Sequence, residues 1–73
     1  MAYTPPTADE IRYLIQAHWR QHPDPSKQLN ADDQDFLDAK VAATRYLLQK
    51  FIRGGMDPHE AENRAMKSVA LAE

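Results

Sequence analysis

Residues 50–70, KFIRGGMDPHEAENRAMKSVA, contain the end of one expected helix, a glycine corner and the start of another helix. Gly54 and Gly55 follow the last apolar residues of the first helix, and glycine adopts the left-handed conformation that ends helices without a Cβ clash. Asp57 then precedes Pro58, which is a strong helix start because aspartate caps free amides and proline is favoured at the first helical position. This corner predicts two consecutive helices in a small all-α fold.

Apolar residues at three- and four-residue spacing extend this prediction to a three-helix bundle. The expected helices cover residues of about 7–21, 31–53 and 58–71. A capping box starts the first helix, in which the hydroxyl of Thr7 accepts from the backbone amide of Glu10 and the Glu10 carboxylate reaches back. We expect its inner face to contain Ile11, Leu14, Ile15, His18 and Trp19.

The middle helix is expected to be the central element because it carries two apolar stripes. Either Asn30 or Asp32 is expected to cap it. We expect both flanking helices to pack on it and its apolar surface to be wider than they can cover. The first stripe is Leu37, Val41, Thr44, Leu48 and Phe51, and the second is Phe36, Ala39, Ala43, Tyr46 and Leu47.

Two segments are expected to lack helix. Residues 1–6 form an extended or flexible lead-in, because Pro5 and Pro6 disfavour the α conformation in the residues before them. Residues 23–30 form a polar connection, since Pro23 and Pro25 end the first helix. The whole chain, residues 1–73, is therefore expected to be a single helical domain.

Size and composition restrict the functional classes. A chain of 73 residues is near the lower limit for a self-sufficient core. It contains no cysteine, which excludes disulfides and thiolate zinc sites and fits a cytoplasmic location. No apolar run approaches the ~20 residues of a membrane span, and the N-terminus does not resemble a signal peptide. The net charge of −2 gives no general attraction to nucleic acid or anionic lipid, so we expect no membrane partner.

No catalytic or cofactor-binding pattern is found. His18 and His22 have a spacing of four that would suit a metal, but we expect them to interact with the negative end of the first helix, with His18 half-buried beside Trp19. The Gly54-Gly55 pair lacks the lysine and hydroxyl residue of a phosphate-binding loop. We therefore expect no enzyme, no catalytic residue, no metal and no cofactor.

Residues 47–66 can be aligned on a helix-turn-helix with Gly55 in the turn. Phe51 would then occupy a contact that needs a small residue, and Asp57 and Glu60 would face phosphates with the wrong sign. A nucleic-acid-associated regulator is therefore the alternative, and nucleic acid is not the expected partner.

The function expected from the sequence is a small non-catalytic module for protein–protein interaction or regulation. Its partner is either another protein or a second copy of the chain. Tyrosine is favoured at interfaces because it covers a large area with few rotatable bonds. The candidate partner-binding surface comprises Tyr13, Arg20, Arg45, Tyr46, Phe51, Ile52 and Arg53.

Overall fold

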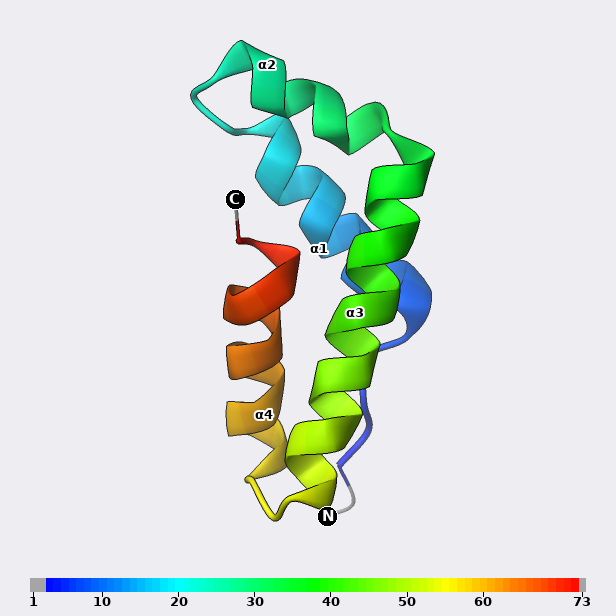
Figure 1. Cartoon of the computed structure of the whole chain (residues 1–73), viewed down its shortest axis with the longest axis vertical. Helices are drawn as coiled ribbons and strands as arrows, with labels where there is room; N and C mark the ends of the chain where they lie inside the picture. Colours follow the sequence, from blue (N-terminus) through cyan, green and yellow to red (C-terminus); the bar gives the residue numbers. More distant parts are fainter. Residues whose placement is uncertain (1–2, 73) are drawn as a thin grey trace.

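The computed structural model, which describes residues 3–72, is built around the long helix α3 (Gln34–Arg53). Helix α1 (Ala8–Arg20) packs on the first half of α3, and α4 (Pro58–Ala65) runs back along its second half (Figure 1). The predicted all-α bundle, with both flanking helices on the middle one, is confirmed. Within residues 3–72, none of the helices is long and apolar enough to cross a membrane.

The start of α1 follows from local sequence. The Thr7 hydroxyl accepts a hydrogen bond of 3.1 Å from the Glu10 amide, as predicted. The Glu10 carboxylate, however, accepts from the Thr7 hydroxyl rather than from its backbone amide. Ile11, Ile15 and Trp19 are buried, at a spacing of four residues.

The predicted inner face of α1 was too wide. Leu14 is 47% exposed and His18 is also exposed, so their expected burial was wrong. The contact of α1 with α3 is a narrow stripe at every fourth residue, and both side chains lie beside that stripe.

The connection predicted for residues 23–30 is helical instead of irregular. A helical turn, α2 (Pro25–Gln28), continues into the 3-10 helix η1 (Leu29–Asp32). Asp24 caps α2 by accepting from the Ser26 amide at 2.9 Å, and Pro25 stands at the first helical position. This is the same Asp-Pro start signal as at Asp57-Pro58, so the sequence contained the information for α2.

Helix α3 begins later than predicted. Its cap is Asp33, which accepts from the Phe36 amide at 3.1 Å, and not Asn30 or Asp32. Those two residues belong to η1, and the chain becomes extended only at Asp33. Ala31 of η1 is fully buried against α1, where its carbonyl accepts from Gln16 at 2.8 Å.

The corner between α3 and α4 matches the prediction closely. Gly55 has a φ of +95°, the left-handed conformation that ends a helix. The amide of Met56 donates to the Phe51 carbonyl at 3.1 Å, and the amide of Gly55 donates to the Ile52 carbonyl at 3.0 Å. These two bonds form a Schellman motif. Asp57 then caps α4 as predicted, accepting from the amide of His59 at 3.1 Å.

The last predicted helix does not stay α-helical to residue 71. After Ala65 the backbone widens into the π-helix η2 (Met66–Ala70), closed by a bond of 2.9 Å from the Leu71 amide to the Met66 carbonyl. Side chains of other helices bind the carbonyls of this segment. The Trp19 indole donates to the carbonyl of Ala70 at 3.2 Å.

Two apolar clusters lie along α3, one under α1 and η2 and the other under α4. They bury most of the apolar surface of α3. Leu37, Val41 and Leu48 are buried, and Tyr46 is the only large apolar residue of α3 that is exposed. The uncovered apolar surface of this helix is smaller than expected, because η2 also packs on α3; it consists of Tyr46 and of the partly buried Phe36, Leu47, Phe51 and Ile52.

Candidate functional site

The second half of α3 presents an exposed cationic surface. Arg45, Lys50 and Arg53 are exposed, and within residues 3–72 no ion pair or hydrogen bond joins the side chain of any of them to another residue. Tyr46, which is 66% exposed, and Gln49 lie between them. We call these five residues the basic face of α3.

The positive charge of this face follows from an uneven distribution of charge along the chain. Residues 39–56 contain four cationic side chains and no Asp or Glu. Lys50 and Arg53 lie in the last turn of α3, where positive charge offsets the helix dipole, whereas Arg45 lies two turns earlier. The other three arginines are paired: Arg12 with Asp38, Arg20 with Asp32, and Arg64 with Glu60.

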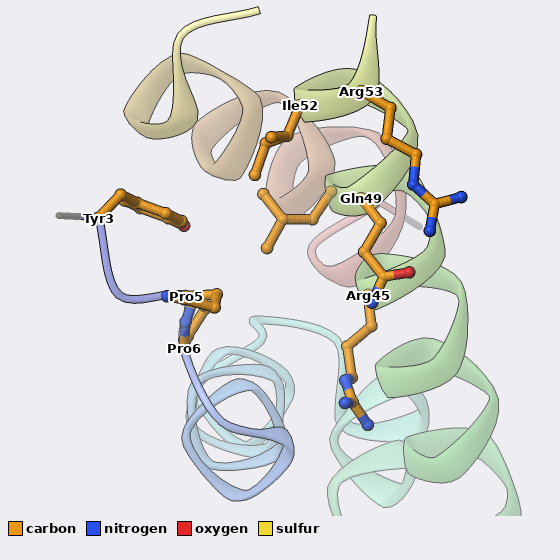
Figure 2. Close-up of a pocket in the computed structure, with 8 residues that line it drawn as sticks. Tyr3, Pro5, Pro6, Arg45, Gln49, Ile52 and Arg53 are labelled. Carbon is orange, nitrogen blue, oxygen red and sulfur yellow. The ribbon is translucent and has the colours of Figure 1, made fainter.

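A groove of about 240 Å³ lies beside this face, between α3 and the lead-in segment of residues 3–6 (Figure 2). Tyr3, Pro5 and Pro6 form one wall. Leu48 and Ile52 line the α3 side, and Figure 2 shows Ile52 pointing into the space between the two segments. Arg45, Gln49 and Arg53 of the basic face also line the groove, so the two features are continuous.

The lead-in is attached to the helices at both of its ends. The Tyr3 hydroxyl donates to the Glu62 carboxylate of α4 at 2.8 Å, and the Tyr3 ring packs edge-on against His59 with centroids 5.4 Å apart. At the other end, Thr7 caps α1. Burial, followed by the hydrogen bond and the negative charge of Glu62, raises the pKa of Tyr3 to about 12.

The structure separates the predicted surface residues into two groups. Arg45, Ile52 and Arg53 line the groove, and Tyr46 lies on the basic face beside them. Phe51 lines neither the groove nor the surface around Tyr46, and its half-buried side chain packs on the apolar cluster beneath α4.

The other predicted residues lie on α1. Tyr13 is 70% exposed and lines, together with Arg20, a separate hollow of about 220 Å³. Neither residue lines the groove beside α3. Arg20 also forms an ion pair of 3.3 Å with Asp32 of η1, so it is not an unpaired cation.

Sequence reasoning missed several residues of the site. Lys50 and Gln49 can be predicted from the sequence, since they lie with Arg45 and Arg53 in residues 39–56, which contain no Asp or Glu. Tyr3, Pro5 and Pro6 were assigned to a lead-in without a role. Their position against α3 depends on the long-range contact with Glu62, which no local pattern encodes.

The histidines at the end of α1 surround Trp19. The His22 ring stacks on Trp19 with centroids 5.7 Å apart, and its Nδ1 accepts from the Asp24 amide at 2.9 Å. His18 meets Trp19 edge-on. Hydrogen bonds from the Ser26 hydroxyl and then the Ser26 amide lower the pKa of Asp24. No group of three His, Asp or Glu side chains within residues 3–72 is arranged to hold a metal.

The corner at residues 47–66 differs from a helix-turn-helix in its geometry. Figure 1 shows α4 running antiparallel beside α3, whereas the helices of a helix-turn-helix cross at about 90–120°. The carboxylate of Asp57 is occupied in capping the amides of His59 and Glu60. The nucleic-acid alternative itself stays a prediction.

Together, the fold and this surface define a small all-α bundle with an exposed basic face and an adjoining apolar groove. The chain matches no protein-family model, and comparison with curated proteins and with solved structures finds no match either.

Proposed function

We propose that this chain is a non-catalytic, cytoplasmic protein-binding module, and that the basic face of α3 binds an acidic segment of another protein. The proposal rests on one observation: Arg45, Lys50 and Arg53 are exposed around Tyr46 and have no anionic partner among residues 3–72. Carboxylates of a partner would supply the missing counter-charges. Complementary potentials of this kind steer association and fix its register more than they add affinity.

The composition of the face favours a protein over a nucleic acid. Affinity for DNA depends on the number of phosphates that a protein neutralises, and the basic face offers three cations. The first half of α3 presents Asp35 on its exposed side, which would repel a long polyanion, and Asp38 beside it is already paired with Arg12. A short acidic segment can engage the three cations without reaching these carboxylates.

The face also has the composition of an interface. Tyr and Arg are enriched where binding energy is concentrated, and Tyr46 lies among arginines and a lysine here. Arginine in particular presents a planar fork of donors that suits a carboxylate. Tyr46 would cover apolar parts of the partner while Arg45 and Arg53 bind its charges.

The experiment measures the affinity of an acidic peptide of Glu, Asp and Gly by NMR titration at low salt. The test variant is Lys50→Glu, and the matched control is Lys67→Glu, because both lysines are exposed and lie in the last turn of a helix. We expect Lys50→Glu to weaken binding about fivefold and Lys67→Glu to leave it within about twofold.

Three outcomes contradict the proposal. Equal loss of affinity in both variants would mean that only net charge matters. Binding of a DNA duplex or single-stranded RNA that Lys50→Glu abolishes, without peptide binding, would favour a nucleic-acid partner. A dimer in sedimentation that Lys50→Glu dissociates and Lys67→Glu preserves would identify a second copy of the chain as the occupant.

A further inference from the structure

We propose that the groove between the lead-in and α3 receives one bulky apolar side chain of the bound segment. The partner is then an acidic segment with a single hydrophobic anchor, such as leucine or phenylalanine, flanked by carboxylates. This inference rests on the proposed function, because the groove adjoins the basic face through Arg45, Gln49 and Arg53.

The size of the groove suits a side chain better than a cofactor. Pockets for drug-sized ligands occupy about 300–1,000 Å³, whereas this groove has a volume of about 240 Å³. The surfaces that face each other across it are apolar: the rings of Tyr3, Pro5 and Pro6 on one side and the aliphatic side chains of Leu48 and Ile52 on the other. An aliphatic or aromatic side chain entering this space would be shielded from water on both of its faces.

The arginines that line the groove can bind carboxylates next to an anchor residue. Figure 2 shows Arg45, Gln49 and Arg53 following one another along α3, with the Arg53 guanidinium turned away from the lead-in. An apolar side chain seated against Ile52 would therefore lie beside a stretch of α3 that carries both arginines, two turns apart. Carboxylates before and after the anchor residue would pair with Arg45 and Arg53. The recognised pattern is therefore an acidic residue, an apolar residue and a second acidic residue.

The groove is formed before any ligand arrives. Its outer wall is fixed to α4 by the hydrogen bond from Tyr3 to Glu62 and to α1 at the cap residue Thr7. Pro5 and Pro6 restrict the backbone between these two attachments. A wall that is already ordered costs little conformational entropy on binding, so even a short segment can gain from filling the groove.

The test uses two acidic peptides of the same length and charge that differ only in the central residue, leucine in one and alanine in the other. We expect the leucine peptide to bind the wild-type chain about tenfold more tightly. In Tyr3→Ala, which removes part of the wall, the preference should fall to about twofold or less.

A second variant distinguishes loss of the groove wall from misfolding of the chain. Glu62→Ala releases the wall without altering any lining residue, and Asn63→Ala, an exposed neighbour on α4, is its control. We expect Glu62→Ala to reduce the leucine preference and Asn63→Ala to preserve it. Burial of Trp19, reported by its fluorescence, shows that each variant is folded.

The outcomes separate this inference from the proposed function. If both peptides bind equally and Lys50→Glu weakens both, the basic face binds acidic segments but the groove receives no anchor. If the leucine preference persists in Tyr3→Ala and in Glu62→Ala, the anchor binds elsewhere and the inference is wrong. If neither peptide binds at low salt, the proposed function and this inference fail together.

Discussion

The ammonium group of Lys40 lies 2.6 Å from the carbonyl oxygen of Val69, so a lysine in the first half of α3 holds the C-terminal segment in place. The same nitrogen donates to the Ala72 carbonyl at 3.0 Å. It also lies 5.5 Å from the centre of the Phe36 ring, within cation–π range. This half-buried lysine thereby donates to carbonyls at and after the end of η2, where the helix itself supplies no amide donors.

Lys40→Met should destabilise the fold by about 2 kcal/mol, because the variant keeps the apolar stem and loses charged donors to backbone carbonyls. Urea unfolding followed by Trp19 fluorescence measures this change. Lys67→Met is the matched control, since Lys67 is exposed, and it should change the free energy of unfolding by less than about 0.5 kcal/mol. Equal effects in the two variants would show that the contacts of Lys40 are not stabilising.

The two glycines of the corner should respond differently to alanine. Gly55→Ala forces a Cβ into a φ of +95° and should cost about 1 kcal/mol, although nothing lies within 4 Å of the added atom. Gly54 has a φ of −77°, and its added Cβ would meet backbone oxygens at ordinary contact distances of 3.5 Å. Gly54→Ala should therefore be neutral or slightly stabilising. A thermal melt in which both variants lose the same stability would contradict this assignment of the corner.

Tyr3→Phe removes the hydrogen bond to Glu62 and should lower the free energy of unfolding by about 1 kcal/mol near neutral pH. The pKa of Tyr3 is raised from 10.0 to about 12 in the folded chain, so folding favours the protonated phenol. The contribution is complete below pH 10 and is lost as the pH rises through about 12, because the unfolded chain releases this proton first.

Ultraviolet difference spectra between the wild type and Tyr3→Phe follow the ionisation of this phenol. A phenol that ionises near pH 10 in the folded protein would show that Tyr3 does not contact Glu62. The lead-in would then be detached from α4, and the groove would lack its outer wall.

Local signals predicted most of the fold. Thr7, Asp57, Pro58 and the glycine corner each act through neighbouring residues, and the structure confirms these helix ends. Helix α2 was missed although Asp24-Pro25 has the same physical basis as Asp57-Pro58. Pro23 and Pro25 predict the end of α1, but Pro25 also follows the cap residue Asp24 and occupies the first position of α2.

Features that depend on long-range contacts were beyond sequence reasoning. The π-helix η2 occurs where Trp19 and Lys40 bind its carbonyls, and those donors come from other helices. Leu14 fits the helical period of α1, yet the contact with α3 is too narrow to cover it. The groove likewise arises from the pairing of Tyr3 with Glu62, 59 residues apart.

The most direct test of the central claim is an NMR map of backbone amide shifts during titration with the acidic leucine peptide at low salt. We predict that the largest shifts occur within residues 45–53 and at Tyr3, and that they disappear in Lys50→Glu combined with Arg53→Glu. Shifts centred on Tyr13 and Arg20 of α1, or spread evenly over the chain, would contradict the claim that the basic face of α3 binds acidic segments.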